Sequence, residues 1–289
     1  MATTLTDRAP EGRSHRASPV LRLDSRPEPL REWFGGLWRS RAVLLALAGK
    51  DFRVRYKRAS LGVVWAVALP LLQAMVMAFI FSRVGRFGAG AGYSYAAYVL
   101  AGMTAWFYAS MSISSATTSI VDASSLTDKV WFPRAVLALV PATANLITLS
   151  ISTLIVVVAL PILGESLTPR LLLLLPASAL LVAFTTALGL ALGALYVYFR
   201  DTKFMVQAVL LVWFYVTPII YPPSVLGSAG RWIDFNPLTG ITGLFQQAAV
   251  DAPVPSGRAI VVSVVTTMVL LLVAVPAHRR HDRLFVDQL

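Results

Sequence analysis

Six apolar runs constrain this chain most, because each is long enough, or nearly so, to cross a lipid bilayer as a helix of about 20 mostly apolar residues. The runs cover residues 62–81, 93–113, 136–160, 171–198, 204–221 and 259–276. Apolar residues make up 57% of the chain and charged residues 13%, against about 45–50% and about 25% in soluble domains. We therefore predict an all-α polytopic membrane protein with six transmembrane helices within residues 61–280.

The basic residues predict the orientation of these helices. With six spans both termini lie on one side, and that side carries 20 of the 25 Lys and Arg residues. Because cytoplasmic loops are enriched in Lys and Arg, both termini are predicted to be cytoplasmic and the protein to lie in the inner membrane. The polar residues 1–35, rich in Arg and Pro, are predicted to be a disordered cytoplasmic tail, and residues 281–289 a second, short cytoplasmic tail.

A net charge of +11 raises the question of a nucleic-acid partner. A nucleic-acid binder carries its basic residues as a patch or stripe on one folded face. Here they fall at the chain ends and between apolar runs, which is the distribution that sets membrane topology. We therefore expect no nucleic acid among the partners.

The stretch before the first run is apolar and basic at the same time. Between residues 33 and 58 apolar side chains recur at helical spacing, and Lys50, Arg53 and Lys57 fall on another face. A basic amphipathic helix of this kind lies in the membrane interface. We predict such an interface helix at residues 36–60. It either anchors the chain beside anionic lipid or also presents its polar face to a cytoplasmic partner.

The connection between the last two runs, residues 222–257, is long. It contains Asn236-Pro237, followed by a moderately apolar run at 238–250 that is too short to span a membrane. We predict short re-entrant outer helices between spans five and six.

Residue types that support enzymatic or ion-coupled chemistry are absent or scattered. The three histidines lie near the chain ends, no apolar run carries a central charge, and the chain has no Cys. Proton- and ion-coupled transporters usually need ionisable groups inside their spans. Gly49-Lys50 precedes Asp51 and lacks the upstream glycine of a phosphate-binding loop. We predict no catalytic residue and no metal site, and any ATP must be bound by a separate chain.

Aromatic residues are frequent in the runs and in the link between the second and third runs. Candidates for a sugar pathway are Trp65, Trp106, Phe107, Tyr108, Trp213, Phe214 and Tyr215. The alternative is ordinary helix packing or an aromatic belt. In the link, Val130, Trp131 and Phe132 stand beside charges, so they lie in an ordinary solvated loop, in the membrane interface or in a partner's groove.

Two sets of small or polar residues inside the runs are typical of helix packing. Pro141, Asn145, Thr148 and Ser152 share one face of the third run. Gly189 and Gly193 form a small-x-x-x-small pair in the fourth.

Four groups of residues together resemble a known family. The first is Arg55-Tyr56-Lys57-Arg58-Ala59-Ser60-Leu61-Gly62 with Trp65 and Pro70-Leu71. The others are Lys129-Val130-Trp131-Phe132-Pro133-Arg134, Phe199-Arg200-Asp201 and Asn236-Pro237-Leu238-Thr239. In this order they are similar to the signature of type-2 ABC exporter permeases for lipid-linked O-antigen, teichoic acid, capsule or cell-wall galactan.

The resemblance implies a transport subunit rather than an enzyme. Members of the family form homodimers with two copies of a separate ATP-binding ABC subunit, which holds ATP and Mg, so no cofactor is expected in this chain. The first and fifth spans would line a channel for a lipid-linked polysaccharide.

The resemblance also implies three functional sets of residues. The ATPase-coupling set is Ser124, Ser125, Leu126, Lys129, Val130, Trp131, Phe132, Pro133 and Arg134. The lipid-phosphate entrance is Lys50, Arg53, Arg55, Lys57 and Arg58, and the outer gate contains Asn236 and Pro237. Family members often carry an Arg about eight residues after the Asn-Pro pair, where this chain has Phe245-Gln246-Gln247.

Two other functions fit the same sequence. A type-2 ABC permease for a drug or lipid would have the same fold. A membrane glycosyltransferase or acyltransferase would instead depend on a metal ion or donor substrate. A neighbouring gene for an ATP-binding subunit would favour an exporter, and neighbouring sugar-transfer genes would favour a glycan.

Overall fold

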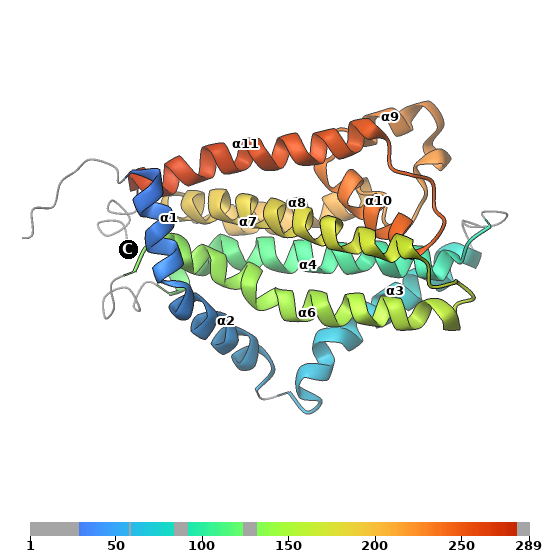
Figure 1. Cartoon of the computed structure of the whole chain (residues 1–289), viewed down its shortest axis with the longest axis horizontal. Coiled ribbons are helices and arrows are strands. Elements are labelled where there is room, and N and C mark those ends of the chain that lie inside the picture. The colour runs from blue at the N-terminus through green and yellow to red at the C-terminus, as the bar shows by residue number, and fades with distance from the viewer. Residues whose placement is uncertain (1–28, 58, 84–91, 124–131, 282–289) are drawn as a thin grey trace, which may run out of the picture.

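The computed structural model describes residues 29–57, 59–83, 92–123 and 132–281, and this part of the chain is helical without any strand (Figure 1). Five helical stretches are long and apolar enough to cross a membrane: Gly62–Arg83, Tyr95–Asp122, Ala135–Ile162, Pro169–Tyr198 and Gly257–Arg279. They agree with five of the six predicted spans. The all-α membrane architecture expected from the apolar runs is therefore confirmed.

These stretches contain helices α3 (Trp65–Arg83), α4 (Tyr95–Asp122), α6 (Ala135–Ile162), α7 (Leu174–Tyr198) and α11 (Gly257–His281). Short 3-10 turns, η1 (Gly62–Val64) and η2 (Pro169–Leu173), precede α3 and α7.

The predicted fifth span departs from this pattern. Helix α8 (Thr202–Val216) has 15 residues, which at 1.5 Å per residue gives about 22 Å, less than the roughly 30 Å of a bilayer core. The apolar sequence continues to Tyr221, but residues 217–221 form bends rather than helix. Pro218 lacks an N–H and disfavours helical geometry at Thr217, which favours an end to the helix there.

The predicted interface helix is two helices. Helix α1 (Leu30–Arg39) and helix α2 (Arg41–Tyr56) meet at Ser40, so the helical region also begins before residue 36, inside the predicted tail. Figure 1 shows α1 lying across one end of the bundle, which we name the α1 end. Trp33 is buried against the ends of the spans, and Gly36 faces Pro133. This packing fixes the direction of α1 and accounts for the break.

The opposite end of the bundle carries the connection between α8 and α11. It contains η3 (Pro223–Ala229), α9 (Gly230–Ile233) and α10 (Pro237–Ala249). We name it the α10 end (Figure 1). Two short helices thus occupy the segment predicted to hold outer helices.

Helix α4 lies at the centre of the bundle. It packs against α3, α6, α7, α8 and α10, and its contacts depend on small side chains. A Cβ atom on Gly189 of α7 would lie 2.7 Å from the Ala116 Cβ, and one on Gly193 would lie 3.1 Å from the Ala116 carbonyl oxygen. The small-x-x-x-small pair therefore serves helix packing, as predicted.

Candidate functional site

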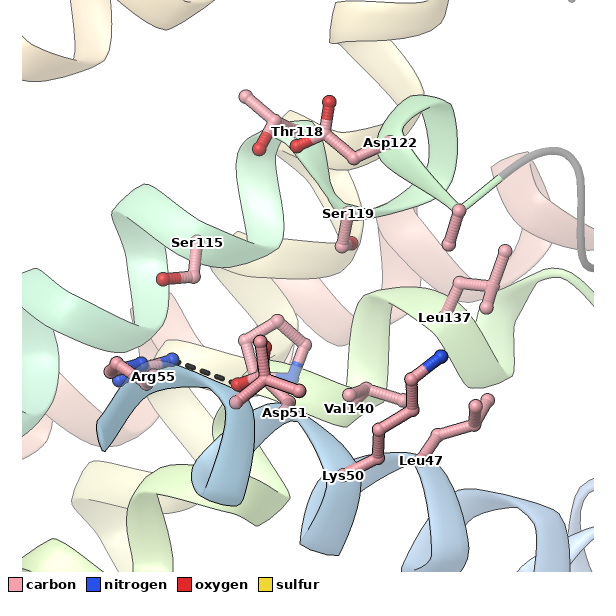
Figure 2. A pocket seen from close by; sticks show the side chains of 13 residues that line it. Leu47, Lys50, Asp51, Arg55, Ser115, Thr118, Ser119, Asp122, Leu137 and Val140 are labelled. Carbon is pink, nitrogen blue, oxygen red and sulfur yellow. Dashed lines mark hydrogen bonds and ion pairs between the residues drawn. The ribbon is translucent and has the colours of Figure 1, made fainter. Parts of the chain in front are cut away.

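A cleft of about 620 Å³ with a mixed polar and apolar lining opens at the α1 end between α2, α4 and α6 (Figure 2). Its polar lining is Lys50, Asp51 and Arg55 from α2 and Ser115, Thr118, Ser119 and Asp122 from α4; Leu137, Val140 and Pro141 of α6 are among its apolar residues. Charged groups and hydroxyls thus surround a space large enough for a polar headgroup.

Arg55 links α2 to α4 and α6 through hydrogen bonds beside this cleft. Its guanidinium donates hydrogen bonds to the Asn145 Oδ1 at 2.8 Å, the Met111 Sδ at 2.9 Å and the Asp51 Oδ2 at 2.8 Å. Asn145 is buried and in turn donates to the Ser112 Oγ at 3.0 Å. A charge-assisted bond to a buried amide is stronger than a neutral one, so this network holds the end of α2 in register with α4 and α6.

The other predicted entrance cations are arranged differently. Lys50 lines the cleft, whereas Arg53 and Lys57 are exposed and do not. Arg53 Nε donates to the Gly49 carbonyl oxygen of its own helix at 3.1 Å. Arg58 lies outside the described residues. The structure therefore brings two of the five, Lys50 and Arg55, to one cleft.

The predicted coupling segment is only partly described. Ser124, Ser125, Leu126, Lys129, Val130 and Trp131 lie outside the described ranges. Phe132, Pro133 and Arg134 are buried, and Phe132 shares an apolar cluster with Trp33 of α1. Phe132 and Pro133 pack against α1, and none of the three buried residues forms an exposed docking surface in this structure.

Four of the seven aromatic residues predicted to line a pathway pack inside the bundle. The Trp106 and Phe214 rings pack edge to face with centroids 5.5 Å apart, and Trp213 packs on Phe184 at 6.2 Å. The buried Tyr108 hydroxyl donates to the Ala142 carbonyl oxygen at 3.0 Å. Helix packing thus accounts for these side chains.

The remaining pathway candidates are more accessible. Tyr215 is 56% exposed and Trp65 is 36% exposed, and Phe107 is half-buried. The seven predicted pathway residues therefore do not line one surface.

At the α10 end, Asn236 joins two helices. Its side-chain oxygen accepts hydrogen bonds from the Leu238 N–H at 3.0 Å and the Trp213 Nε1 at 2.8 Å. Its amide donates to the Thr217 Oγ1 at 2.9 Å. Asn is a favoured N-cap and Pro237 a favoured first helical residue, so the start of α10 was readable from sequence. The bond to Trp213 was not, because the two residues belong to different helices.

Comparisons with known proteins bear on this arrangement. Residues 42–249 match the family described as "ABC-2 type transporter". The chain is 26% identical over 241 residues to the O-antigen export system permease protein RfbA of Myxococcus xanthus, covering 82% of this chain and 92% of that protein. It is 30% identical over 203 residues to a protein of the same name from Klebsiella pneumoniae, covering 69% and 76%. This multi-pass membrane chain is a permease that belongs to the ABC-2 type transporter family.

Proposed function

We propose that this permease is the transmembrane subunit of an ATP-driven exporter that carries a lipid-linked polysaccharide of the O-antigen type across the inner membrane. The names of its relatives support the class of substrate. The observation that carries the proposal is the cleft at the α1 end, which Lys50 and Arg55 line together with hydroxyl side chains of α4. Cations beside hydroxyl donors suit the phosphate that joins a glycan to its lipid carrier.

The distribution of basic residues supports a cytoplasmic α1 end. A substrate assembled in the cytoplasm would then approach the cleft from the side where α2 lies in the membrane interface. Ser115, Thr118 and Ser119 of α4 line this space together with residues of α2 (Figure 2). The cleft is thus an entrance for the polar headgroup, while the lipid tails remain in the bilayer.

An ATP-binding ABC subunit completes the proposed exporter. Helix α4 ends at Asp122 and α6 begins at Ala135 at the same end as the cleft, so a partner bound at these two helix ends would act directly on two of the three helices that line it. Two permease copies with two ATPase subunits follow from the family resemblance. In this arrangement ATP hydrolysis in the partner would change the spacing of α2, α4 and α6, and thus the entrance.

The test is purification of the tagged permease with a candidate ATP-binding subunit from its own organism, followed by export of lipid-linked polysaccharide into proteoliposomes. We expect a two-plus-two complex whose ATP hydrolysis is stimulated by this substrate. Arg55→Gln should lower export about tenfold or more, because a charged donor is lost from the cleft. Arg41→Gln, the same change at an exposed position of α2, should export as the parent does.

Two results would contradict the proposal. Normal export by an Arg55→Gln complex would remove the cleft from the pathway. Stimulation by a drug or a phospholipid, with no response to polysaccharide, would assign the permease to another substrate class.

A further inference from the structure

The segment after α8 is backbone without helix, buried inside the protein. Thr217, Pro218, Ile219 and Ile220 are all buried, and Thr217 and Ile219 have no exposed surface. Backbone carbonyls that leave a helix at membrane depth must find other donors, since each unpaired one costs free energy. The question is which groups supply those donors.

Three side chains from two other helices supply them. Gln246 of α10 donates its Nε2 to the carbonyl oxygens of Pro218 at 3.0 Å and Ile219 at 3.2 Å. Tyr98 of α4 donates its hydroxyl toward the carbonyls of Pro218 and Tyr221 at 3.4 and 3.3 Å. Tyr95 of α4 donates to the carbonyl of Ile220. Side-chain bonds thus replace the helical ladder at the carbonyls of residues 218–221, whereas the Thr217 carbonyl accepts from the Ile219 N–H at 2.7 Å.

The chain makes room for this arrangement at Gly102. A Cβ atom there would lie 2.8 Å from the Gln246 Nε2 and 3.2 Å from the Ile219 carbonyl oxygen. Such distances require the segment or the glutamine to move. Glycine at this position therefore permits α4, α10 and the unwound segment to touch.

Residues near both ends of helix α10 donate hydrogen bonds to the unwound segment. Asn236, at its start, donates to Thr217, and Gln246, three residues before its end, donates to Pro218 and Ile219. Helix α10 is itself bound to α11, because the Ser263 hydroxyl donates to the Pro237 carbonyl oxygen at 2.6 Å. The end of α8 is thereby tied to α4 on one side and to α10 and α11 on the other.

We propose that Gln246, Tyr95 and Tyr98 are positioning residues that hold the unwound end of α8 closed, and that release of its carbonyls by these donors opens the α10 end of the permease. Residues 217–221 with these three side chains are named the α8 latch. Side-chain donors can exchange with water one at a time, whereas helical bonds break only with unwinding, so the latch makes this end the easiest part of α8 to open. The proposal refines the outer gate of the proposed function, but its test needs neither substrate nor ATPase, so the two can fail separately.

The absence of native Cys allows a direct measurement. Ile219→Cys places one thiol in the latch, and Ala177→Cys places one at a buried position of α7. The full chain is reconstituted in lipid nanodiscs, and the rate of labelling by a membrane-impermeant maleimide is measured for each thiol with and without Gln246→Leu. That substitution keeps much of the side-chain volume and removes the donor.

We expect Gln246→Leu to speed labelling of the Ile219→Cys thiol about tenfold, since two hydrogen bonds are lost, and to leave the Ala177→Cys rate unchanged. Gln247→Leu, the same change one residue further on α10, should alter neither rate. Tyr98→Phe, which removes one oxygen and keeps the ring, should speed labelling about threefold at Ile219→Cys.

Two outcomes would overturn the latch. Rates at Ile219→Cys within twofold of the parent in both Gln246→Leu and Tyr98→Phe would show that these donors do not hold the segment. An equal rise at Ala177→Cys would show general loosening of the bundle instead of opening at this end.

Discussion

Helices α3 and α4 are neighbours of spanning length, yet they differ sharply in burial. Over the most apolar window of each span, 72% of the α4 residues are buried and 18% of those in the α3 stretch. The buried faces of α4 carry mainly Ala, Gly, Ser, Thr and Tyr, whereas α3 turns Leu72, Met75 and Phe79 outward.

The difference shows which property separates an inner from an outer span. In a bilayer the lipid is as apolar as leucine, so burial gains little from hydrophobicity alone. Small side chains and internal hydrogen bonds let α4 approach five other helices. Helix α3 keeps large side chains on a face that its own chain leaves uncovered.

The largest effect should come from added bulk on the α4–α7 contact. Gly189→Val places a branched side chain where even a Cβ would lie 2.7 Å from the Ala116 Cβ, and overpacking of this kind costs about 1–3 kcal/mol or more. Val76→Leu on the exposed face of α3 should stay within about 0.5 kcal/mol. The measurement is thermal unfolding of the purified protein in detergent. If both variants lost the same amount of stability, tight packing would not distinguish α4 from α3.

Asn145→Leu should cause the next largest loss of stability. It removes the amide that accepts from Arg55 and donates to Ser112, leaving a guanidinium with fewer partners, at a cost of about 1–3 kcal/mol. A double-mutant cycle with Arg55→Met measures the coupling between the two side chains. Additive effects would mean that Arg55 does not depend on Asn145.

Tyr108→Phe tests a single hydrogen bond between α4 and α6. The hydroxyl bond to the Ala142 carbonyl oxygen is buried, and its loss should cost about 1 kcal/mol. Tyr215→Phe, the same change at an exposed position of α8, should cost less. Chemical or thermal unfolding of both variants would sharpen the contrast between interior and surface hydroxyls.

The smallest effect is expected on α3. Phe79 is 66% exposed, so Phe79→Ala should change stability by no more than about 0.5 kcal/mol in detergent. Unfolding curves and light-scattering mass of the variant and parent check this. A loss above 1 kcal/mol together with a lower mass would instead mean that another copy covers this face.

The spans were predictable because their length in apolar residues is set by membrane thickness. The start of α10 was predictable because Asn-Pro is a local capping signal. The end of α8 was not predictable from its proline alone. Pro70 and Pro141 lie inside helices that continue past them, whereas the helix before Pro218 ends. What distinguishes Pro218 is the supply of donors from Tyr98 and Gln246, which come from distant parts of the sequence.

The same limit applies to the cleft at the α1 end. The cationic stretch of α2 was evident from sequence, but the inward turn of Arg55 depends on Asn145, which lies 90 residues away. The break at Ser40 likewise follows from the packing of Trp33 against the bundle. The aromatic triplets were ambiguous because packing and pathway use the same residue types.

The cleft at the α1 end has one further property. Its two cations, Lys50 and Arg55, are matched in number by two acids, Asp51 and Asp122. Arg55 already forms an ion pair with Asp51 at 2.8 Å, so an anion that bound Arg55 would share the guanidinium with this carboxylate. The carboxylate would compete with such an anion for the guanidinium and would thereby favour its release.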